Sequence, residues 1–397
     1  MLPNCGIFIS KQRSILISIT KASIIDDYFS SVKVELFYLV CFRFFDNMFD
    51  ISFHTTIEDL STELWCEIFA FFDALELYET FGNINHRITT MLSEHALLYF
   101  KIATITDYDF AYDDVLPKVN NLSNVRSIKL NKEFQIEDFF TRWPPNTFSR
   151  LCCLSLVYLG ALMSDCSIAL VEQLSTLTFF ESLHIRVGRI VYHDKYLKRL
   201  IQLIFIENDS FHSLKRFALR CDHDVFYIPT STKRTRLELI TLPSFGFTKF
   251  LQFLPCIPYI KSIKVDRLIS DHDEITPVPM PSSDFRLSNC VDLRLHLDYY
   301  ITYENIELLL HHVPNLTQLK ISCDYSRFHG KKWEILLMEN CSKLKKFEII
   351  GLLQHRYFAL PSFDELRNDF STTFWLVRNV QYEHDLQRCR LIVRFEI

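Results

Sequence analysis

Side chains that could hold a metal ion occur together at three places in the sequence. Asp222-His223-Asp224 could bind a cation, His311 and His312 are adjacent, and Cys152 and Cys153 are adjacent. Neighbouring residues on a helix point about 100° apart, so the two histidines do not converge on one ion. Two adjacent cysteines do not clamp one tetrahedral metal comfortably. We interpret the histidines as a surface pair at a helix end and the Asp-His-Asp group as a loop.

The motifs that mark common catalytic sites are missing from the sequence. It contains no G-x-S-x-G, H-E-x-x-H, P-loop or G-x-G-x-x-G pattern and no C-x-x-C pair. Seven glycines in 397 residues also argue against a glycine-rich loop that cradles phosphate. We therefore expect a protein that is not an enzyme and that needs no metal and no cofactor.

Composition indicates a globular protein of a reducing compartment. Hydrophobic residues make up 49% of the chain, and the formal net charge of -5 gives no reason to expect nucleic-acid binding. The 12 cysteines are scattered through apolar segments, which favours buried thiols over disulfides. No secretory signal is evident, and the apolar run from Val34 to Phe45 is too short for a membrane span. We expect a location in the cytoplasm or the nucleus and no membrane partner.

One pattern, apolar-x-x-apolar-x-apolar, recurs from residue 125 to residue 349 at intervals of 23 to 34 residues. Its last two apolar positions flank a polar residue, as in a short strand with one buried face. The residues at the fourth position of the pattern are predicted to stack as one buried ladder: Ile128, Leu154, Leu183, Phe217, Ile263, Leu293, Leu319 and Phe347, with Ile240 as a ninth.

This recurrence predicts an α/β fold, a leucine-rich-repeat solenoid in which parallel strands form a horseshoe. One strand and its helical return cannot bury their own apolar face, so stability must come from stacked neighbours. The alternative is an ordinary α/β domain with parallel strands. At the end of the chain, residues 374–377 and 391–395 are predicted to be two paired strands around a turn near His384 and Asp385, closing the core as a cap.

A helical module precedes the repeats. Ser61 or Thr62 can cap a first helix, and Asp73 followed by Glu76 is typical of the start of a second. A third apolar face follows near residues 84–92. Three short helices in about 35 residues cannot bury much core alone, so we expect part of their apolar surface to contact a partner.

The segment from Leu60 to Ile88 resembles an F-box, and with repeats directly downstream the chain is similar to F-box proteins with leucine-rich repeats. The resemblance implies a non-catalytic substrate receptor of a cullin-based SCF ubiquitin ligase, acting in ubiquitin-dependent degradation. Its F-box would dock to the small Skp-type adaptor, and its repeats would hold the protein substrate. The residues implied in adaptor binding are Leu60, Glu63, Leu64, Ile68, Phe69, Leu75, Leu77 and Phe81.

Two departures from the F-box pattern leave an alternative open. Ser61 stands where a proline is usual, and Ile88 stands where a tryptophan is usual. The alternative function is a leucine-rich protein-interaction scaffold whose degenerate F-box no longer binds the adaptor. The domains expected are an N-terminal extension (1–54), the F-box-like module (55–100), the repeat solenoid (101–370) and the cap (371–397).

The strand positions that alternate with the buried ladder are rich in cations. They are predicted to face the concave surface and to bind the substrate: Lys129, Arg186, Arg216, Arg220, Lys264, Arg294, Lys320 and Lys346. Only Asp266, Asp292 and Glu348 are acidic among these positions. This excess predicts an acidic or phosphorylated partner segment. The alternative is that solvated lysine and arginine side chains only protect short strands from aggregation.

Overall fold

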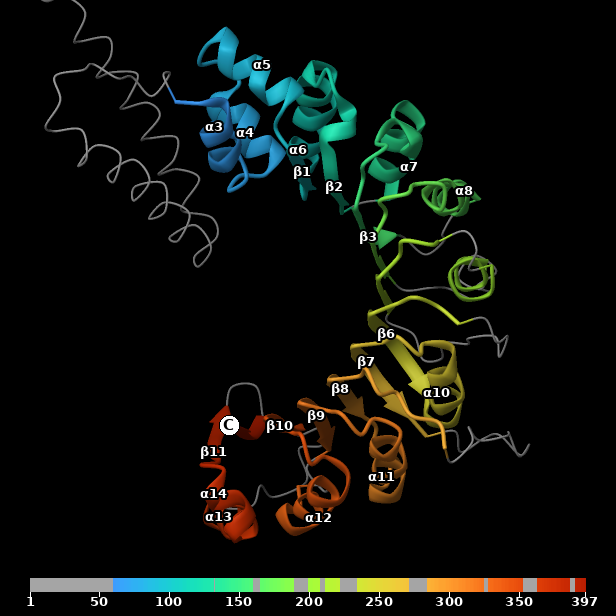
Figure 1. The fold of residues 1–397 in the computed structure, drawn as a ribbon, viewed down its shortest axis with the longest axis vertical. Helices are drawn as coiled ribbons and strands as arrows, with labels where there is room; N and C mark the ends of the chain where they lie inside the picture. Colours follow the sequence, from blue (N-terminus) through green and yellow to red (C-terminus); the bar gives the residue numbers. More distant parts are fainter. Residues whose placement is uncertain are drawn as a thin grey trace, which may run out of the picture. The chain divides into compact units, whose positions relative to one another are not determined.

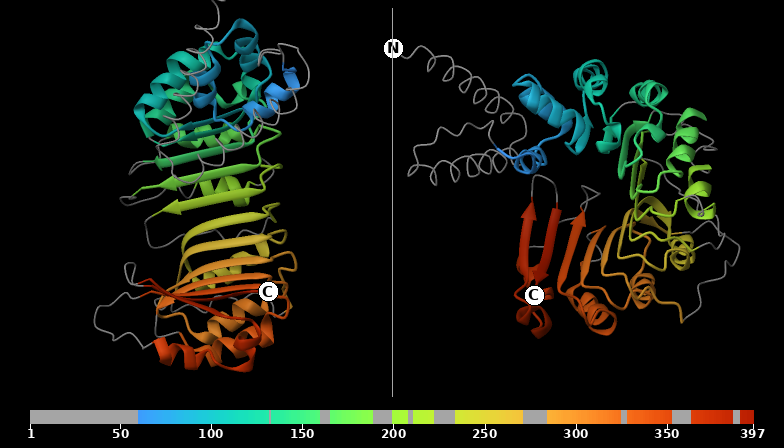
Figure 2. Two further views of the ribbon diagram at one scale, coloured as in Figure 1. Left: turned by 90° about the vertical axis from the view of Figure 1, so that its left-hand side faces the viewer. Right: turned by 45° about the horizontal axis from the view of Figure 1, so that its top comes forward.

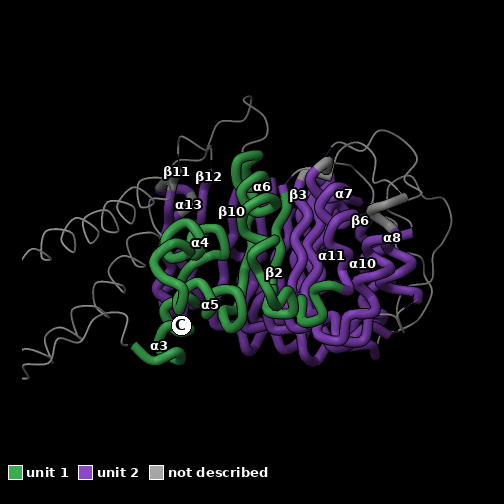
Figure 3. The backbone as a smooth tube through the Cα atoms, turned by 90° about the horizontal axis from the view of Figure 1, so that it is seen from above, with its two compact units in different colours: residues 1–130, 147–151 green, residues 131–146, 152–397 purple. Residues whose placement is uncertain are grey.

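The computed structural model describes residues 60–131, 133–159, 165–188, 199–207, 211–221, 234–270, 284–324, 328–352, 363–385 and 390–397. The chain divides into unit 1, Met1–Leu130 with Thr147–Leu151, and unit 2, Asn131–Asn146 with Cys152–Ile397 (Figure 3). The expected N-terminal extension, residues 1–54, and the Asp222-His223-Asp224 group lie outside the described residues.

Unit 1 is mainly helical, with one pair of parallel strands. Its elements are α3 (Thr62–Phe69), α4 (Ala74–Phe81), α5 (His86–Glu94), β1 (Leu98–Ile102), α6 (Ile105–Asp109), the π-helix η2 (Phe110–Val115), the short 3-10 helices η3 (Leu116–Lys118) and η4 (Leu122–Asn124), and β2 (Val125–Leu130).

Unit 2 alternates strands with helical returns. Its strands are β3 (Cys153–Leu159), β4 (Ser182–Val187), β5 (Arg216–Cys221), β6 (Leu239–Gly246), β7 (Ser262–Ile269), β8 (Asp292–Leu297), β9 (Gln318–Asp324), β10 (Lys346–Leu352), β11 (Gln381–Asp385) and β12 (Arg390–Glu396). Its helices are α7 (Glu133–Arg142), α8 (Asp165–Leu174), η6 (Gln202–Ile206), α10 (Phe247–Phe253), η7 (Leu254–Cys256), α11 (Tyr303–His311), α12 (Gly330–Asn340), α13 (Phe363–Asp369) and α14 (Thr373–Val377). A short 3-10 helix, η5 (Pro145–Thr147), begins in unit 2 and ends in unit 1.

Side-chain caps define where the helices of the module begin. The Ser61 hydroxyl accepts a hydrogen bond from the backbone amide of Leu64, three residues later in the sequence. The Asp73 carboxylate accepts from the amides of Leu75 and Glu76 at 3.0 Å, and Glu76 returns the contact by accepting from the Asp73 amide. These bonds satisfy amide groups that have no partner within the helix, so the predicted start signals at Ser61 and Asp73 are confirmed.

The predicted ladder is confirmed in unit 2. Strands β3 to β10 pair in parallel and in chain order, and the fourth-position residues of the pattern from Leu154 to Phe347, Ile240 included, are successive cross-strand partners. None of them is more than 2% exposed. In unit 1, Ile128 is also fully buried and pairs with Phe100 of β1. The same apolar position of each repeat is therefore in register from β3 to β10.

A backbone contact repeats at each junction between strands of unit 2. The carbonyl oxygen just before one strand accepts hydrogen bonds from two consecutive amides at the start of the next repeat. The acceptors are Cys152, Glu181, Lys215, Glu238, Lys261, Val291 and Thr317, at 2.7 to 3.1 Å. At Lys345, the next position in this series, the carbonyl accepts from the amide of Ile397 instead. The contact uses no side chain, so it survives the sequence differences between repeats.

The helical returns of unit 2 lie on one face of its sheet. Helices α7, α8, α10, α11 and α12 follow one another along that face, as Figures 1 and 2 show. No described helix covers the opposite face, which we call the open face. Of the described helices, none is both long enough and apolar enough to cross a lipid bilayer. The arrangement is an α/β repeat array with a mostly parallel sheet.

The cap differs from the prediction in one strand. Residues 374–377 belong to helix α14 and not to a strand, and the strand that pairs with β12 is β11, residues 381–385. Trp375 is fully buried and its ring lies 5.9 Å from that of Phe347, a contact that a helix makes from the helical side of the sheet. The other half of the prediction is confirmed, since residues 391–395 lie in β12, antiparallel to β10.

Candidate functional site

Five of the eight side chains predicted to bind the adaptor lie in the core of the helical module. They are Ile68, Phe69, Leu75, Leu77 and Phe81. Phe69 and Phe81 join Trp65 in an aromatic cluster, with ring centroids 5.4 to 5.8 Å apart. Burial of large rings in such offset and edge-on contacts is what holds a module of this size together.

The segment after the module supplies the missing cover. Strand β1 and helix η2 both pack against α4. The apolar residues of β1 alternate with exposed ones, and Leu98, Phe100 and Ile102 are buried. The three helices do not cover their apolar faces alone, but for these five residues the cover comes from the same chain and not from a partner, so the expectation of a partner contact is wrong for them. The cover comes from β1 and η2, which belong to the same unit as the three helices.

The remaining three predicted residues are accessible. Leu60 and Leu64 are half-buried and Glu63 is exposed. Hydrogen bonds from the backbone of Glu63 and from Ser61 lower the pKa of the Glu63 carboxyl, so it is ionised at neutral pH. The side chain of Arg87 donates to the Leu60 carbonyl at 2.7 Å, which ties the start of α3 to α5. The accessible part of the predicted site is thus the beginning of α3.

A fourth accessible residue, Phe71, was not among the predicted adaptor contacts. Phe71 and Phe72 both fit the apolar spacing of α3, at seven and eight residues after Leu64. Phe72 packs edge-on against Phe81 at 5.5 Å, whereas Phe71 is 43% exposed. Periodicity alone could not tell which of the two points outward, because the choice depends on the turn between α3 and α4.

The cations predicted to bind a substrate occupy the expected strand positions. In unit 2 each of them alternates with buried residues of its strand, and Lys264, Arg294 and Lys320 are successive cross-strand partners. Neighbouring strands lie about 5 Å apart, so these three form one row on the open face. Arg186 and Arg220 are partners in the same way on β4 and β5. Lys129 lies on β2, in unit 1.

Acidic residues of the same face pair with most of these cations. The ion pairs are Lys264–Asp266 at 2.7 Å, Arg294–Asp292 at 3.0 Å, Lys320–Glu348 at 2.9 Å, Lys346–Glu396 at 3.1 Å and Arg220–Asp266 at 3.9 Å. Glu396 belongs to β12, which the sequence analysis treated as a cap and left out of the charge comparison. The open face is therefore a row of exposed ion pairs, more nearly neutral than the sequence predicted.

A buried charge that the sequence analysis did not identify lies at the ends of β7 and β8. Asp298 is 8% exposed, and Arg267 donates to its Oδ2 atom at 2.7 Å. Its Oδ1 atom is buried without a hydrogen-bond partner. Burial and the nearby Arg267 lower the pKa of His296, which is therefore neutral at physiological pH. The register shifts between Val265 and Leu268, so strict alternation could not have placed Arg267.

The interpretation of His311 and His312 as a surface pair is wrong for His312. Its side chain is 2% exposed, and its Nδ1 atom lies 2.9 Å from the carbonyl oxygen of Phe285. Within the described ranges no group of three or more His, Cys, Asp or Glu side chains could hold a metal ion. The cysteines placed in those ranges carry free thiols, and Cys256, Cys290, Cys323 and Cys341 are buried.

Comparison with known proteins adds no relative to this description. No protein-family model matches the sequence, and a search of curated proteins returns no match.

Proposed function

We propose that this chain is the substrate-recognition subunit of a cullin-based SCF ubiquitin ligase. Its helical module docks to the Skp-type adaptor, and the open face of its sheet binds the protein substrate. The order of the parts supports this: three capped helices that resemble an F-box come directly before an array of strands and helical returns. Ubiquitin transfer belongs to other subunits, so the chain needs no catalytic residue of its own.

The observation that carries the proposal is the pair of accessible apolar side chains on α3 and just after it. The module already buries a closed aromatic core, yet Leu64 is only half-buried and Phe71 is 43% exposed. Leu64 lies on α3, and Phe71 lies in the turn that follows it, two residues after the helix ends at Phe69. Large apolar side chains left accessible on a well-packed module are typical of a protein-binding site.

Replacing Leu64 and Phe71 together with aspartate should weaken binding to the purified Skp-type adaptor by about a hundredfold, because buried apolar anchors dominate interface energies. The measurement is an equilibrium titration of the full chain with the adaptor. The module should stay folded, because neither residue belongs to its core.

Ile105→Asp is the matched control, since Ile105 is 53% exposed in the same unit and is not part of the proposed face. It should leave the affinity unchanged. Unaltered binding by the folded double variant would show that the docking face is elsewhere. A change at Ile68 is unsuitable for this test, because Ile68 is buried and its loss disturbs the module itself.

A second candidate function is the interaction scaffold with a degenerate F-box. The specific observation in its favour is that Ile88, the residue in place of the usual tryptophan, is 1% exposed and buried in the module, and so offers no surface to a partner. If the unmodified chain does not bind the adaptor at micromolar concentrations, the scaffold function is the one that remains.

Reversing the charge of Arg220, Lys264 and Arg294 to glutamate should weaken binding of a fluorescent decaglutamate peptide by about tenfold or more, because three neighbouring cations become anions. Binding to the unmodified chain should also fall as salt is raised from 50 to 300 mM, since exposed charges are screened. Fluorescence anisotropy measures both effects.

The matched control reverses Arg142, Lys331 and Lys332, which are exposed and lie on α7 and α12, on the helical side of the sheet, and so gives the same change in net charge. Ion pairs at the surface contribute little to folding, so both triple variants should keep the thermal stability of the parent to within a few degrees. Equal loss of binding in the two variants would mean that net charge, and not the open face, attracts the peptide.

A further inference from the structure

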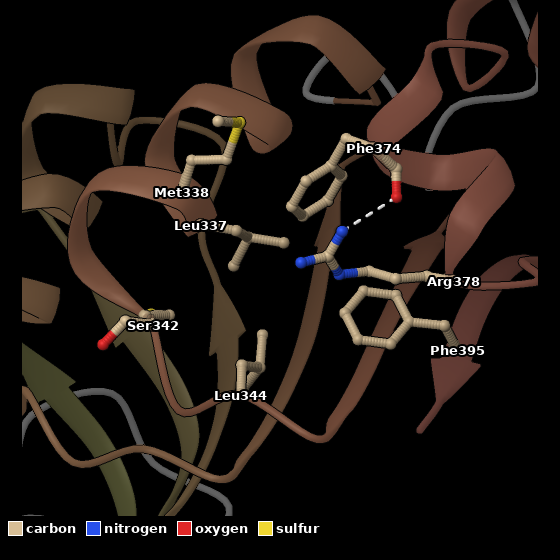
Figure 4. Close-up of a pocket in the computed structure, with 8 residues that line it drawn as sticks. Leu337, Met338, Ser342, Leu344, Phe374, Arg378 and Phe395 are labelled. Atoms are coloured by element: carbon tan, nitrogen blue, oxygen red, sulfur yellow. Dashed lines mark hydrogen bonds between the residues drawn. The ribbon is translucent and has the colours of Figure 1, made fainter.

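A small cavity lies where the last helices meet β10 and β12 in unit 2. It has a volume of about 170 Å³ and opens to solvent. Its walls come from α12, from the turn before β10, from α14 and from β12 (Figure 4). The residues that line it are Leu337, Met338, Cys341, Ser342, Leu344, Phe374, Arg378 and Phe395.

Arg378 is the one charged side chain among the residues that line this cavity. Its guanidinium lies between two phenyl rings, 3.7 Å from the ring centroid of Phe374 and 5.7 Å from that of Phe395 (Figure 4). One of its N–H groups donates to the Phe374 carbonyl at 3.0 Å. Stacking between rings fixes the plane of the guanidinium and leaves its remaining donors at the edge. Figure 4 shows that edge directed toward Leu337.

No carboxylate of the described residues pairs with this guanidinium. The cavity wall offers no anion either, because burial raises the pKa of the Cys341 thiol to about 12 and keeps it neutral. This contrasts with the open face, where acidic side chains accompany the cations. Arg378 thus presents an uncompensated positive charge inside a mostly apolar wall, a combination that favours a carboxylate attached to an apolar group.

The size of the cavity and its rim indicate what carries that carboxylate. Small-molecule sites usually measure about 300 to 1,000 Å³, so 170 Å³ accommodates a single side chain. Met338, which lines the cavity, is 62% exposed, and α14, which contributes Phe374 to the wall, ends in Leu376 and Val377, 69% and 77% exposed. Exposed apolar side chains beside an anchor pocket are typical of a protein-protein contact.

We propose that this cavity binds a segment of a partner protein in which a large apolar residue adjoins an aspartate or glutamate. The apolar side chain enters between Leu337 and Leu344, and the carboxylate accepts two hydrogen bonds from Arg378. The partner's flanking residues cover Met338 and the exposed end of α14. The inference concerns the cap alone and is independent of adaptor docking by the helical module.

The test uses the full chain and two capped tetrapeptides, glycine-phenylalanine-glutamate-glycine and its glutamine counterpart. Ligand-observed saturation-transfer NMR, with the peptide titrated, should show saturable binding of the glutamate peptide. The glutamine peptide should bind at least about tenfold more weakly, because a neutral amide replaces a charge-assisted pair. Equal binding of the two peptides would overturn the proposal. Equally tight binding of hexanoate would overturn the choice of a protein partner.

Variants separate the cavity from the rest of the surface. Arg378→Gln should reduce binding of the glutamate peptide about tenfold, and Lys345→Gln, an exposed charge outside the lining, should not change it. Met338→Glu should also abolish peptide binding, since it places a competing carboxylate at the mouth, and its exposed position keeps the fold intact. Full binding by Met338→Glu would overturn the proposal even if the Arg378 variant failed to fold.

Discussion

Replacing Phe347 with alanine should lower the free energy of unfolding by about 3–5 kcal/mol, the usual cost of truncating a buried phenylalanine. Phe347 ends the ladder, is fully buried, and packs against the rings of Trp333, Trp375 and Phe395 at 5.7 to 5.9 Å. A cavity there removes contacts from the sheet, the last return and the cap together. Chemical denaturation followed by tryptophan fluorescence measures the loss.

Ile335→Ala is the control for this prediction. Ile335 lies on α12 near the same cluster but is 55% exposed, so its truncation should cost less than about 0.5 kcal/mol. A loss of under 1 kcal/mol for Phe347→Ala would contradict the ladder as the central packing element of unit 2.

Gly330→Ala should destabilise the protein by about 1–3 kcal/mol, against the usual sign of this substitution. In most helix positions alanine stabilises relative to glycine by roughly 0.5–1 kcal/mol. A Cβ on Gly330 would lie 2.2 Å from the Asp369 carbonyl oxygen, so the backbone of α12 or α13 must move. That movement also disturbs the bond from Trp375 Nε1 to the Gly330 carbonyl, now 3.3 Å long.

Lys331→Ala is the control, because Lys331 is the next residue of α12 and its side chain is exposed, so shortening it creates no steric clash. The difference between the two denaturation midpoints isolates the steric effect. A Gly330→Ala variant as stable as the parent would mean that α12 and α13 do not approach as closely as this contact requires.

The parallel sheet could be predicted because one sequence pattern carries its register. In every repeat except that of Phe217, a polar residue stands between the two apolar positions, so Leu293 and Leu319 can be placed in register from the sequence of their own repeats. The open-face positions followed from the same alternation. Where the register shifts, as it does before Leu268, the pattern no longer indicates which side chain faces which way.

The cap and the core of the helical module could not be predicted in the same way. Residues 374–377 are four apolar or aromatic residues, too few to distinguish the period of a strand from that of a helix. Trp375 of α14 is buried against Phe347, a tertiary contact between the cap and the last strand of the repeats. Likewise, the sequence indicated that Leu77 and Phe81 would be accessible to a partner. In the structure they are buried, and β1 and η2, which follow α5, pack against α4. Local periodicity contains no information about such tertiary cover.

The backbone contact at the end of the repeats has a consequence for self-association. The carbonyl at each earlier junction accepts hydrogen bonds from amides at the start of the next repeat. After the last repeat, β12 lies antiparallel to β10, and the Lys345 carbonyl accepts a hydrogen bond from the amide of Ile397. The edge where a strand from a second molecule could add by backbone pairing is thereby closed. The outermost strand at this edge is β11, which is five residues long and carries Glu383. A short, charged edge strand is a poor template for pairing with a strand of a second molecule. At this edge of the sheet, the C-terminal strands therefore disfavour the addition of further molecules into a fibril.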